Sequence, residues 1–247
     1  MLTSRYRARE ALLRERFLRR IKTSEFPCVG AKAALGRDQL EVHVARDLTS
    51  AWDDLRIYRH LRSFAADYKR RARLFSSFAV IFDGPQTLDE AGFERHLWSR
   101  LQSLHDKDIW HGQPHDDRVA TDPASPHFGM SFGGEAFFVV GLHPRASREA
   151  RRFPQPVLVF NLHDQFEQLR AQNRYEKLRG AILDRDLALA GSINPMLARH
   201  GDTSEAAQYS GRAVGPDWQC PYSGRGRGHL GGGAVGNNDD DRLRDVA

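Results

Sequence analysis

The stretches AFFVVGL (136–142) and VLVFN (157–161) decide the fold. Both are apolar throughout and rich in Phe and Val, which is typical of strands covered on both faces. Two further strands are predicted by LEVHVAR (40–46), in which apolar residues alternate, and by FAVIFD (78–83). We therefore expect a central, mostly antiparallel or mixed sheet of four or more strands.

Helical patterns lie before, between and after these strands. Leu12, Leu13, Phe17 and Ile21 recur at steps of one, four and four residues, so a basic amphipathic helix is predicted over 4–22. Further helices are expected over 51–73, 88–104, 147–152 and 163–189, with one or two helical turns over 31–35. The fold class is therefore α+β, with the sheet flanked by helices in one domain.

Two segments lack this periodicity. Residues 106–130 are rich in Asp, His and Pro and are predicted to form a long loop, as is the stretch 191–202. After Tyr222 the sequence continues GRGRGHLGGGAVGNNDDD, which is of low complexity and predicted to be disordered. We expect one domain over 1–223 and a Gly/Arg/Asp-rich tail over 224–247.

Composition narrows the class of protein. With 247 residues, 40% hydrophobic and 28% charged, the chain can bury one sizeable core. The apolar runs are too short to cross a bilayer, and the arginine-rich start contains no apolar signal segment. The net charge of +5 comes from arginines spread along the chain, which argues against a nucleic-acid interface. We expect a cytoplasmic protein that binds neither membrane nor nucleic acid.

Common catalytic signatures such as the P-loop, the nucleophile elbow and the zinc-protease motif do not occur. The candidate functional residues are instead histidines in or near the ends of predicted elements: His43, His105, His143 and His163. A neutral imidazole nitrogen is a common ligand of iron or zinc. For each histidine taken alone, a hydrogen-bonded structural role remains the alternative.

Cys28 and Cys220 each stand beside a proline. Two cysteines do not make a disulfide scaffold, and a free cysteine is usually a small buried hydrophobe. The more specific possibility is a thiolate ligand to haem iron.

Charged residues beside the strands suggest binding of ions. Arg145, Arg148 and Arg152 would share one face if this stretch were helical and could pair with carboxylates, with a solvated basic face as the alternative. Glu135 and Asp83 stand at a strand start and a strand end. Either carboxylate could hold a guanidinium or amine, although a turn or cap role is the simpler reading of Asp83.

Three motifs are specific. FPCVGAKAAL (26–35), the long stretch FGMSFGGEAFFVVGLHPRASREARRFPQPVLVFNLHDQFEQLR (128–170) and SGRAVGPDWQCPYS (210–223) resemble the YqcI/YcgG family. The resemblance covers residues 5–223, and the tail beyond departs from the family pattern.

The resemblance implies a function. Part of the family consists of haem-dependent N-oxygenases that hydroxylate a guanidine nitrogen of arginine or an arginine derivative, as in D-cycloserine and guanitoxin biosynthesis. LEVHVARDL (40–48) is similar to that branch, which implies that His43 is the iron ligand. The implied cofactor is haem b with O2 and an external electron donor. The implied partners are a guanidino or amino substrate and a reductase, with a possible homodimer.

Further roles follow within this hypothesis. His143 and His163 match family motifs and are second candidates for iron ligation or catalysis on the substrate side. We expect Glu135 to hold the substrate guanidinium, and Lys32 or Arg148 to hold the substrate carboxylate or a haem propionate. Cys28 is a further cofactor-binding candidate. The alternatives are a non-catalytic haem- or redox-sensing protein that uses Cys28 and Cys220, and, last, a nucleic-acid binder.

Overall fold

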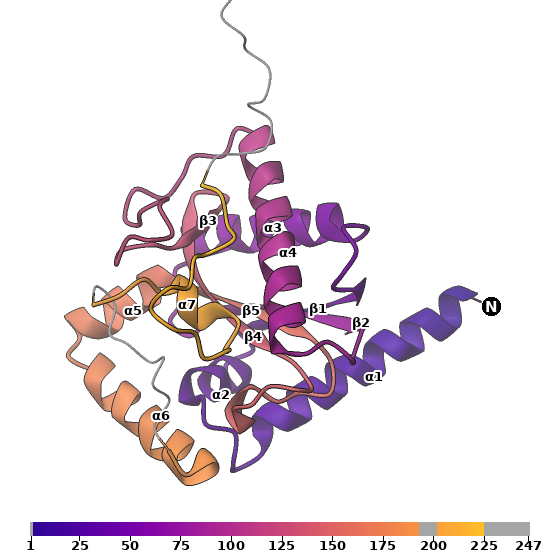
Figure 1. The fold of residues 1–247 in the computed structure, drawn as a ribbon, viewed down its shortest axis with the longest axis horizontal. Helices are drawn as coiled ribbons and strands as arrows, with labels where there is room; N and C mark the ends of the chain where they lie inside the picture. The colour runs from indigo at the N-terminus through magenta and orange to yellow at the C-terminus, as the bar shows by residue number, and fades with distance from the viewer. Residues whose placement is uncertain (1, 193–201, 225–247) are drawn as a thin grey trace, which may run out of the picture.

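The computed structural model describes residues 2–192 and 202–224, and its centre is a five-stranded sheet (Figure 1). The strands lie in the order β1-β2-β5-β4-β3. They are β1 (Leu40–Asp47), β2 (Ser77–Gly84), β3 (Met130–Phe132), β4 (Glu135–Leu142) and β5 (Val157–Leu162). The predicted α+β class with a mixed sheet is confirmed.

Strand pairing follows from the connections. β1 and β2 are parallel, with His43 opposite Val80, and the helix α3 (Asp54–Arg70) makes the crossover that a parallel pair needs. All other pairs are antiparallel. β5 lies in the middle of the sheet, which explains why its sequence is apolar on both faces.

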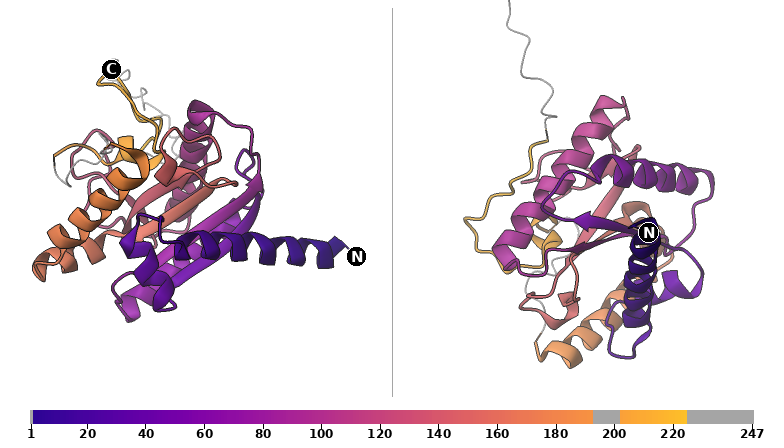
Figure 2. Two further views of the ribbon diagram at one scale, coloured as in Figure 1. Left: turned by 90° about the horizontal axis from the view of Figure 1, so that it is seen from below. Right: turned by 90° about the vertical axis from the view of Figure 1, so that its right-hand side faces the viewer.

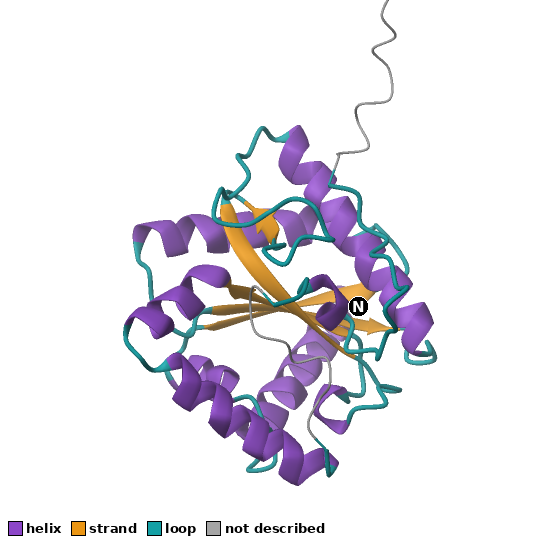
Figure 3. Cartoon of the chain, turned by 60° about the vertical axis from the view of Figure 1, so that its left-hand side comes forward, coloured by secondary structure: helices purple, strands orange, loops and turns teal. Residues whose placement is uncertain are grey.

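Helices cover the sheet on both faces (Figures 1 and 3). On one face lie α3 and α4 (Glu90–Trp110), over a core that includes Phe78, Phe93 and Phe160. On the other face lie α1 (Leu2–Lys22), α2 (Val29–Gly36), α5 (His163–Ala171) and α6 (Tyr175–Ala190). We call these the α3/α4 face and the α1/α6 face.

The N-terminal helix is amphipathic as predicted. Leu13, Phe17 and Ile21 are fully buried against the sheet, whereas Leu12 points away and is exposed. The N-terminal end of α1 extends beyond the edge of the sheet (Figure 2). The buried residues of α1 therefore pack against the sheet on the α1/α6 face.

Two predicted helices are wrong in detail. The expected helix over 163–189 is broken into α5 and α6, because Asn173 adopts the left-handed conformation with φ of 54°. The expected helix over 147–152 is a single 3-10 turn, Glu149–Arg151, with extended residues on either side. Arg145, Arg148 and Arg152 therefore do not share a helical face.

Other boundaries shift. The third predicted helix begins at Asp54 rather than 51, and α4 continues to Trp110 into the predicted loop over 106–130. The short strand β3 was not predicted, because three residues give too little periodicity. The last helix is α7 (Ala206–Tyr209). Most of the predicted loop 191–202 and of the predicted tail lies outside the described residues.

Within residues 2–192 and 202–224, the helices are too short or too polar to cross a membrane.

Candidate functional site

A cavity of about 300 Å³ lies between the sheet and the helices of the α1/α6 face. Its floor is formed by alternate strand residues, among them Val140, Val159 and Asn161, because successive side chains point to opposite faces. Its walls include Phe17 on α1 and Phe166 on α5. The volume is at the lower end of the range of about 300–1,000 Å³ for small-molecule sites.

The lining is mainly apolar, but polar side chains also contribute to it. Five of them come from five separate segments of the chain: Cys28, Arg151, His163, Asp186 and Glu205. The others are Ser77, Arg148, Asn161, Gln165, Arg170, Tyr175, Arg179 and Gln208. An apolar cavity with a few convergent polar groups is the usual form of a ligand site.

His163 and Glu205 form a buried pair in this lining. His163 is the first residue of α5, directly after β5, so the end of the sheet fixes its position. Its Nε2 lies 2.9 Å from Oε2 of Glu205. A carboxylate bound to one ring nitrogen sets the tautomer and orientation of the imidazole, as it does for histidines that bind metals.

Arg151 is a buried cation without an ion-pair partner among the described residues. Its guanidinium donates hydrogen bonds to three backbone carbonyls, those of Gly141, Gln208 and Tyr209, at 3.1–3.4 Å. Burial lowers the pKa of Arg151 to about 10, which still leaves it charged at neutral pH. The carboxylate of Asp186 acts on Arg151 only from beyond ion-pair distance, and a buried cation without an ion pair on a cavity wall favours a ligand with an anionic group.

Cys28 is the N-cap of α2. Its Sγ accepts a hydrogen bond from the backbone N–H of Ala31 at 3.4 Å. Burial raises the pKa of the thiol, although the helix amides and nearby Arg151 act in the opposite direction. The thiol is therefore protonated at neutral pH unless an electrophile such as a metal ion binds to it.

Arg148 also lines the cavity, but its charge is already neutralised. It forms a buried ion pair with Asp186 of α6, in which Nε donates to Oδ2 at 3.1 Å. The predicted anion partner of Arg148 is thus a carboxylate of this chain. The pair ties the 3-10 segment to α6.

His43, the expected iron ligand, lies away from the cavity. It is on the α3/α4 face of β1, where its ring stacks on His60 with centroids 4.0 Å apart and on Phe78 at 5.0 Å. Its Nε2 lies 2.5 Å from Oε1 of Glu41. The cavity is lined instead by Leu40 from the same strand.

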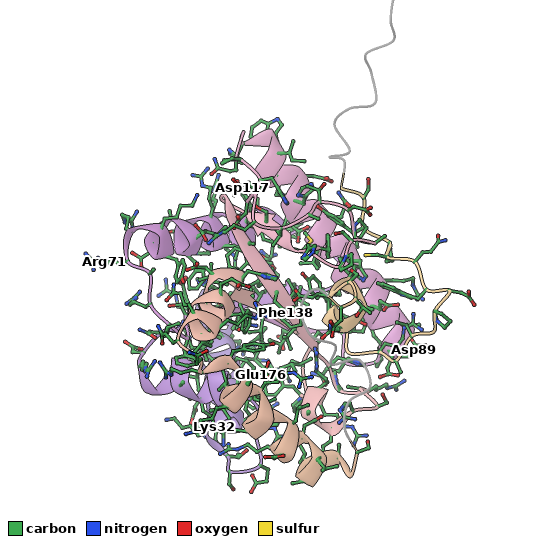
Figure 4. All side chains as sticks on the ribbon, turned by 90° about the vertical axis from the view of Figure 1, so that its left-hand side faces the viewer. Lys32, Arg71, Asp89, Asp117, Phe138 and Glu176 are labelled. Atoms are coloured by element: carbon green, nitrogen blue, oxygen red, sulfur yellow. The ribbon has the colours of Figure 1, made fainter. Side chains whose placement is uncertain are left out.

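His143 and Lys32 are not at the cavity either. His143 is buried on the α3/α4 face, stacked on Phe93 with centroids 4.4 Å apart, and burial lowers its pKa to about 4. Lys32 donates to the backbone oxygens of Thr23 and Ser24 and lies at the periphery, whereas Phe138 lies in the middle of the molecule (Figure 4). Both residues have local structural roles here.

Glu135 does hold a guanidinium, but one of this chain. Arg118 donates to Glu135 at 2.8 Å, to Asp116 at 2.6 Å and to Asp164 at 3.1 Å. Burial raises the pKa of Glu135, against the effect of Arg118. Arg118 thereby fixes the loop over 111–129 to the sheet.

The two cysteines lie in different cores. Cys28 packs in the core of the α1/α6 face and Cys220 against that of the α3/α4 face. Burial raises the pKa of Cys220 to about 12. A cysteine pair acting as a redox sensor is not supported by this arrangement.

Sequence reasoning missed Glu205 and Asp186 and gave no special role to Arg151. Asp186 lay inside an expected helix and Glu205 in a segment without a motif. The partners of Arg151 are backbone carbonyls, two of them more than fifty residues away, so side-chain patterns carry no signal of them. His163, Cys28 and Arg148 are the predicted site residues that the cavity brings together.

The protein is a mixed α+β domain with a mainly apolar cavity between the sheet and the helices of the α1/α6 face. The sequence matches the YqcI/YcgG family over residues 17–223, more than four-fifths of the chain. The protein therefore belongs to the YqcI/YcgG family. Searches of curated proteins and of solved structures found no match.

Proposed function

We propose that the protein is a haem-dependent monooxygenase that hydroxylates a guanidine nitrogen of arginine or of a related metabolite, and that its active site is the cavity on the α1/α6 face. The observation that carries the proposal is the pairing of His163 with Glu205 on a wall that also holds Arg151, a cation without a carboxylate partner among the described residues.

The chemistry of the lining supports haem as the cofactor. A porphyrin needs apolar walls, an axial ligand and cations for its propionates. The cavity offers the aromatic walls of Phe17 and Phe166, the imidazole of His163 and the guanidinium of Arg151. Bound there, haem would supply the O2 chemistry that oxidises nitrogen, with electrons from a reductase.

His163, rather than His43, is the histidine that would hold the haem iron in this cavity. Its Nε2 lies against the carboxylate of Glu205, which fixes the orientation of the ring as carboxylates do beside metal-bound histidines. Cys28 and Tyr175 are other donors of types that bind haem iron in the lining, and Cys28 is the one considered at the sequence level. Its raised pKa keeps the thiol protonated without a metal, which favours the imidazole.

The remaining polar groups suit an amino-acid substrate. Arg151 can bind a carboxylate of the substrate or a propionate through forked hydrogen bonds. Asp186 is the buried carboxylate for a substrate guanidinium, provided that the guanidinium takes the place of Arg148. The apolar walls exclude water and so strengthen these charge interactions.

The test combines a spectrum with an assay. Protein produced with ample haem should be red and show a Soret band. With arginine, a reductant and O2 it should form a product that carries one additional oxygen on the guanidine, detected by mass spectrometry. His163→Gly should lose the haem spectrum, and added imidazole should restore it by occupying the vacated space.

Colourless protein with unchanged arginine would overturn the proposal. A red protein that forms no product from arginine or its analogues would support the haem-sensing alternative instead. If Cys28→Ala alters the spectrum while His163→Gly does not, the cavity remains the haem site but the ligand is the thiolate.

A further inference from the structure

We propose that Glu41, His43 and His60 form a second site, separate from the cavity, that binds a divalent first-row transition-metal ion such as Zn²⁺. These side chains lie where strand β1 meets helix α3, on the α3/α4 face. The cavity proposed for haem lies on the opposite face, so this inference stands independently of the proposed function.

The fold brings the three side chains together. Glu41 and His43 are two residues apart on β1 and so point to the same side of the sheet. His60 reaches them from α3, which crosses over this strand, and its ring stacks on that of His43 with centroids 4.0 Å apart. The candidate ligand atoms all lie within 4.8 Å of one another.

This spacing is close to that of a metal site. Zinc bonds of about 2.0–2.1 Å in a tetrahedron separate the ligand atoms by roughly 3.3 Å. Nε2 of His43 and Oε1 of Glu41 are already 2.5 Å apart. Binding of an ion would turn the two rings out of their stacked arrangement, so that one nitrogen of each ring points at the ion, and would lengthen the contact between His43 and Glu41.

The donor set is chemically selective. Two imidazoles and one carboxylate suit zinc or ferrous iron, whereas calcium and magnesium require oxygen ligands. The carboxylate contributes one negative charge toward the dication. The Glu41 side chain is 42% exposed and that of His43 18% exposed, so solvent can supply the remaining ligands.

The surroundings hold the site in place. Phe78 stacks on His43 from within the core. Arg56, four residues before His60 on α3, donates to the carbonyl of Val44 at 2.7 Å and to Asp53 at 3.3 Å, so the carboxylate of Asp53 offsets part of its charge. His60 is half-buried on α3, and its ring is held beside that of His43.

The experiment is a titration of the haem-free full-length protein with Zn²⁺ by calorimetry, and with Co²⁺ by visible absorption. Wild-type protein should bind one equivalent of Zn²⁺ at this site, and Co²⁺ should give the bands of a four- or five-coordinate complex. His60→Ala should weaken binding by more than about 100-fold, since loss of even an outer-shell partner costs 10–100-fold. His127→Ala, in an exposed loop, is the control and should bind as wild type does.

A Zn²⁺ affinity that is the same in wild type, His60→Ala and His127→Ala would overturn the site, as would the absence of binding. Because His60 is half-buried, circular dichroism should verify that its variant is folded. Glu41→Gln, at a more exposed position, offers a second test and should weaken binding at least tenfold. X-ray absorption of the bound metal should show two imidazoles, and a spectrum with oxygen ligands alone would also contradict the assignment.

Discussion

His43 and His163 lie on opposite faces of the same sheet. His43 faces α3 and stacks on His60, whereas His163 opens α5 and lines the cavity under α1 and α6. The two imidazoles therefore cannot bind the same ion or molecule in this arrangement. The metal chemistry proposed here assigns haem to the cavity of His163 and a single metal ion to the cluster of His43.

Replacing Arg151 should affect both stability and ligand binding. Arg151→Gln would leave the carbonyls of Gly141, Gln208 and Tyr209 without their donors. We expect a loss of about 2–4 kcal/mol in the free energy of unfolding, since each buried unsatisfied group costs about 1–3 kcal/mol. Urea denaturation measures this loss, and haem titration of the folded variant should show weaker binding.

The matched control is Arg145→Gln, at an exposed arginine six residues earlier. This substitution should change neither the free energy of unfolding nor the free energy of haem binding by more than about 0.5 kcal/mol. If the two substitutions had equal effects, the net charge of the protein, rather than the buried cation, would be responsible for the losses of stability and haem binding.

Removing the carboxylate beside His163 should weaken the haem site without abolishing it. Glu205→Gln keeps the shape of the side chain but is a poorer acceptor for the imidazole. Haem affinity should fall by about 10–100-fold, as for other outer-shell partners of metal-bound histidines. The reduction potential of the haem should rise, because a less basic imidazole stabilises ferric iron less.

Redox titration and haem transfer to apomyoglobin measure these two quantities. Glu149→Gln, at an exposed carboxylate, should leave both unchanged. An unaltered potential in Glu205→Gln would show that Glu205 does not act on the iron through His163.

A pair of glycines tests the packing of the sheet. In Gly141→Ala the added Cβ would lie 2.7 Å from Phe93 and 2.9 Å from Leu97 of α4. We expect a loss of about 1–3 kcal/mol, typical of overpacking a core. Gly180→Ala in helix α6 meets nothing within 4 Å and should stabilise by about 0.5–1 kcal/mol through helix propensity.

Thermal and urea denaturation of the two variants provide the comparison. The critical result is that the two substitutions change the free energy of unfolding in opposite directions. Destabilisation by both would contradict the positions of α4 and α6 relative to their neighbours.

His143 should make the protein sensitive to acid. Burial lowers the pKa of His143 from 6.5 to about 4, so the folded state binds fewer protons than the unfolded state between these values. The free energy of unfolding is therefore not reduced by His143 above pH 6.5, and it decreases as the pH falls through 6.5 toward 4. The loss is about 3 kcal/mol, at 1.36 kcal/mol for each unit of pKa.

His143→Phe should keep the ring stacked on Phe93 and remove this part of the pH dependence. The free energy of unfolding, measured from pH 7 to pH 4 for wild type and variant, gives the difference. His127→Ala should retain the wild-type slope, and a parallel slope for His143→Phe would contradict the assignment.

The layers of the fold could be predicted because they depend on local periodicity. The apolar stretches at 136–142 and 157–161 became β4 and β5, and the stripe of Leu13, Phe17 and Ile21 became the buried side of α1. The break at Asn173 could not be predicted, because a single residue with positive φ does not alter the hydrophobic pattern. Neither could β3, which is defined by pairing with β4 rather than by its three residues.

The site was predicted only in part. His163, Cys28 and Arg148 were selected for their positions beside strands, and they do line one cavity. Glu135 was expected to hold a guanidinium, but the one it holds belongs to Arg118, from a loop whose path the sequence does not reveal. The face on which His43 lies follows from alternation along β1, but the location of the cavity on the other face depends on how four helices pack.

The most direct test of the central claim compares the haem spectra of His43→Ala and His163→Ala, prepared side by side with ample haem. We expect that His163→Ala loses the Soret band, or shifts it to that of a weakly ligated haem, while His43→Ala retains the wild-type spectrum. A normal spectrum for His163→Ala together with loss of haem from His43→Ala would contradict it, and would place the porphyrin on the α3/α4 face.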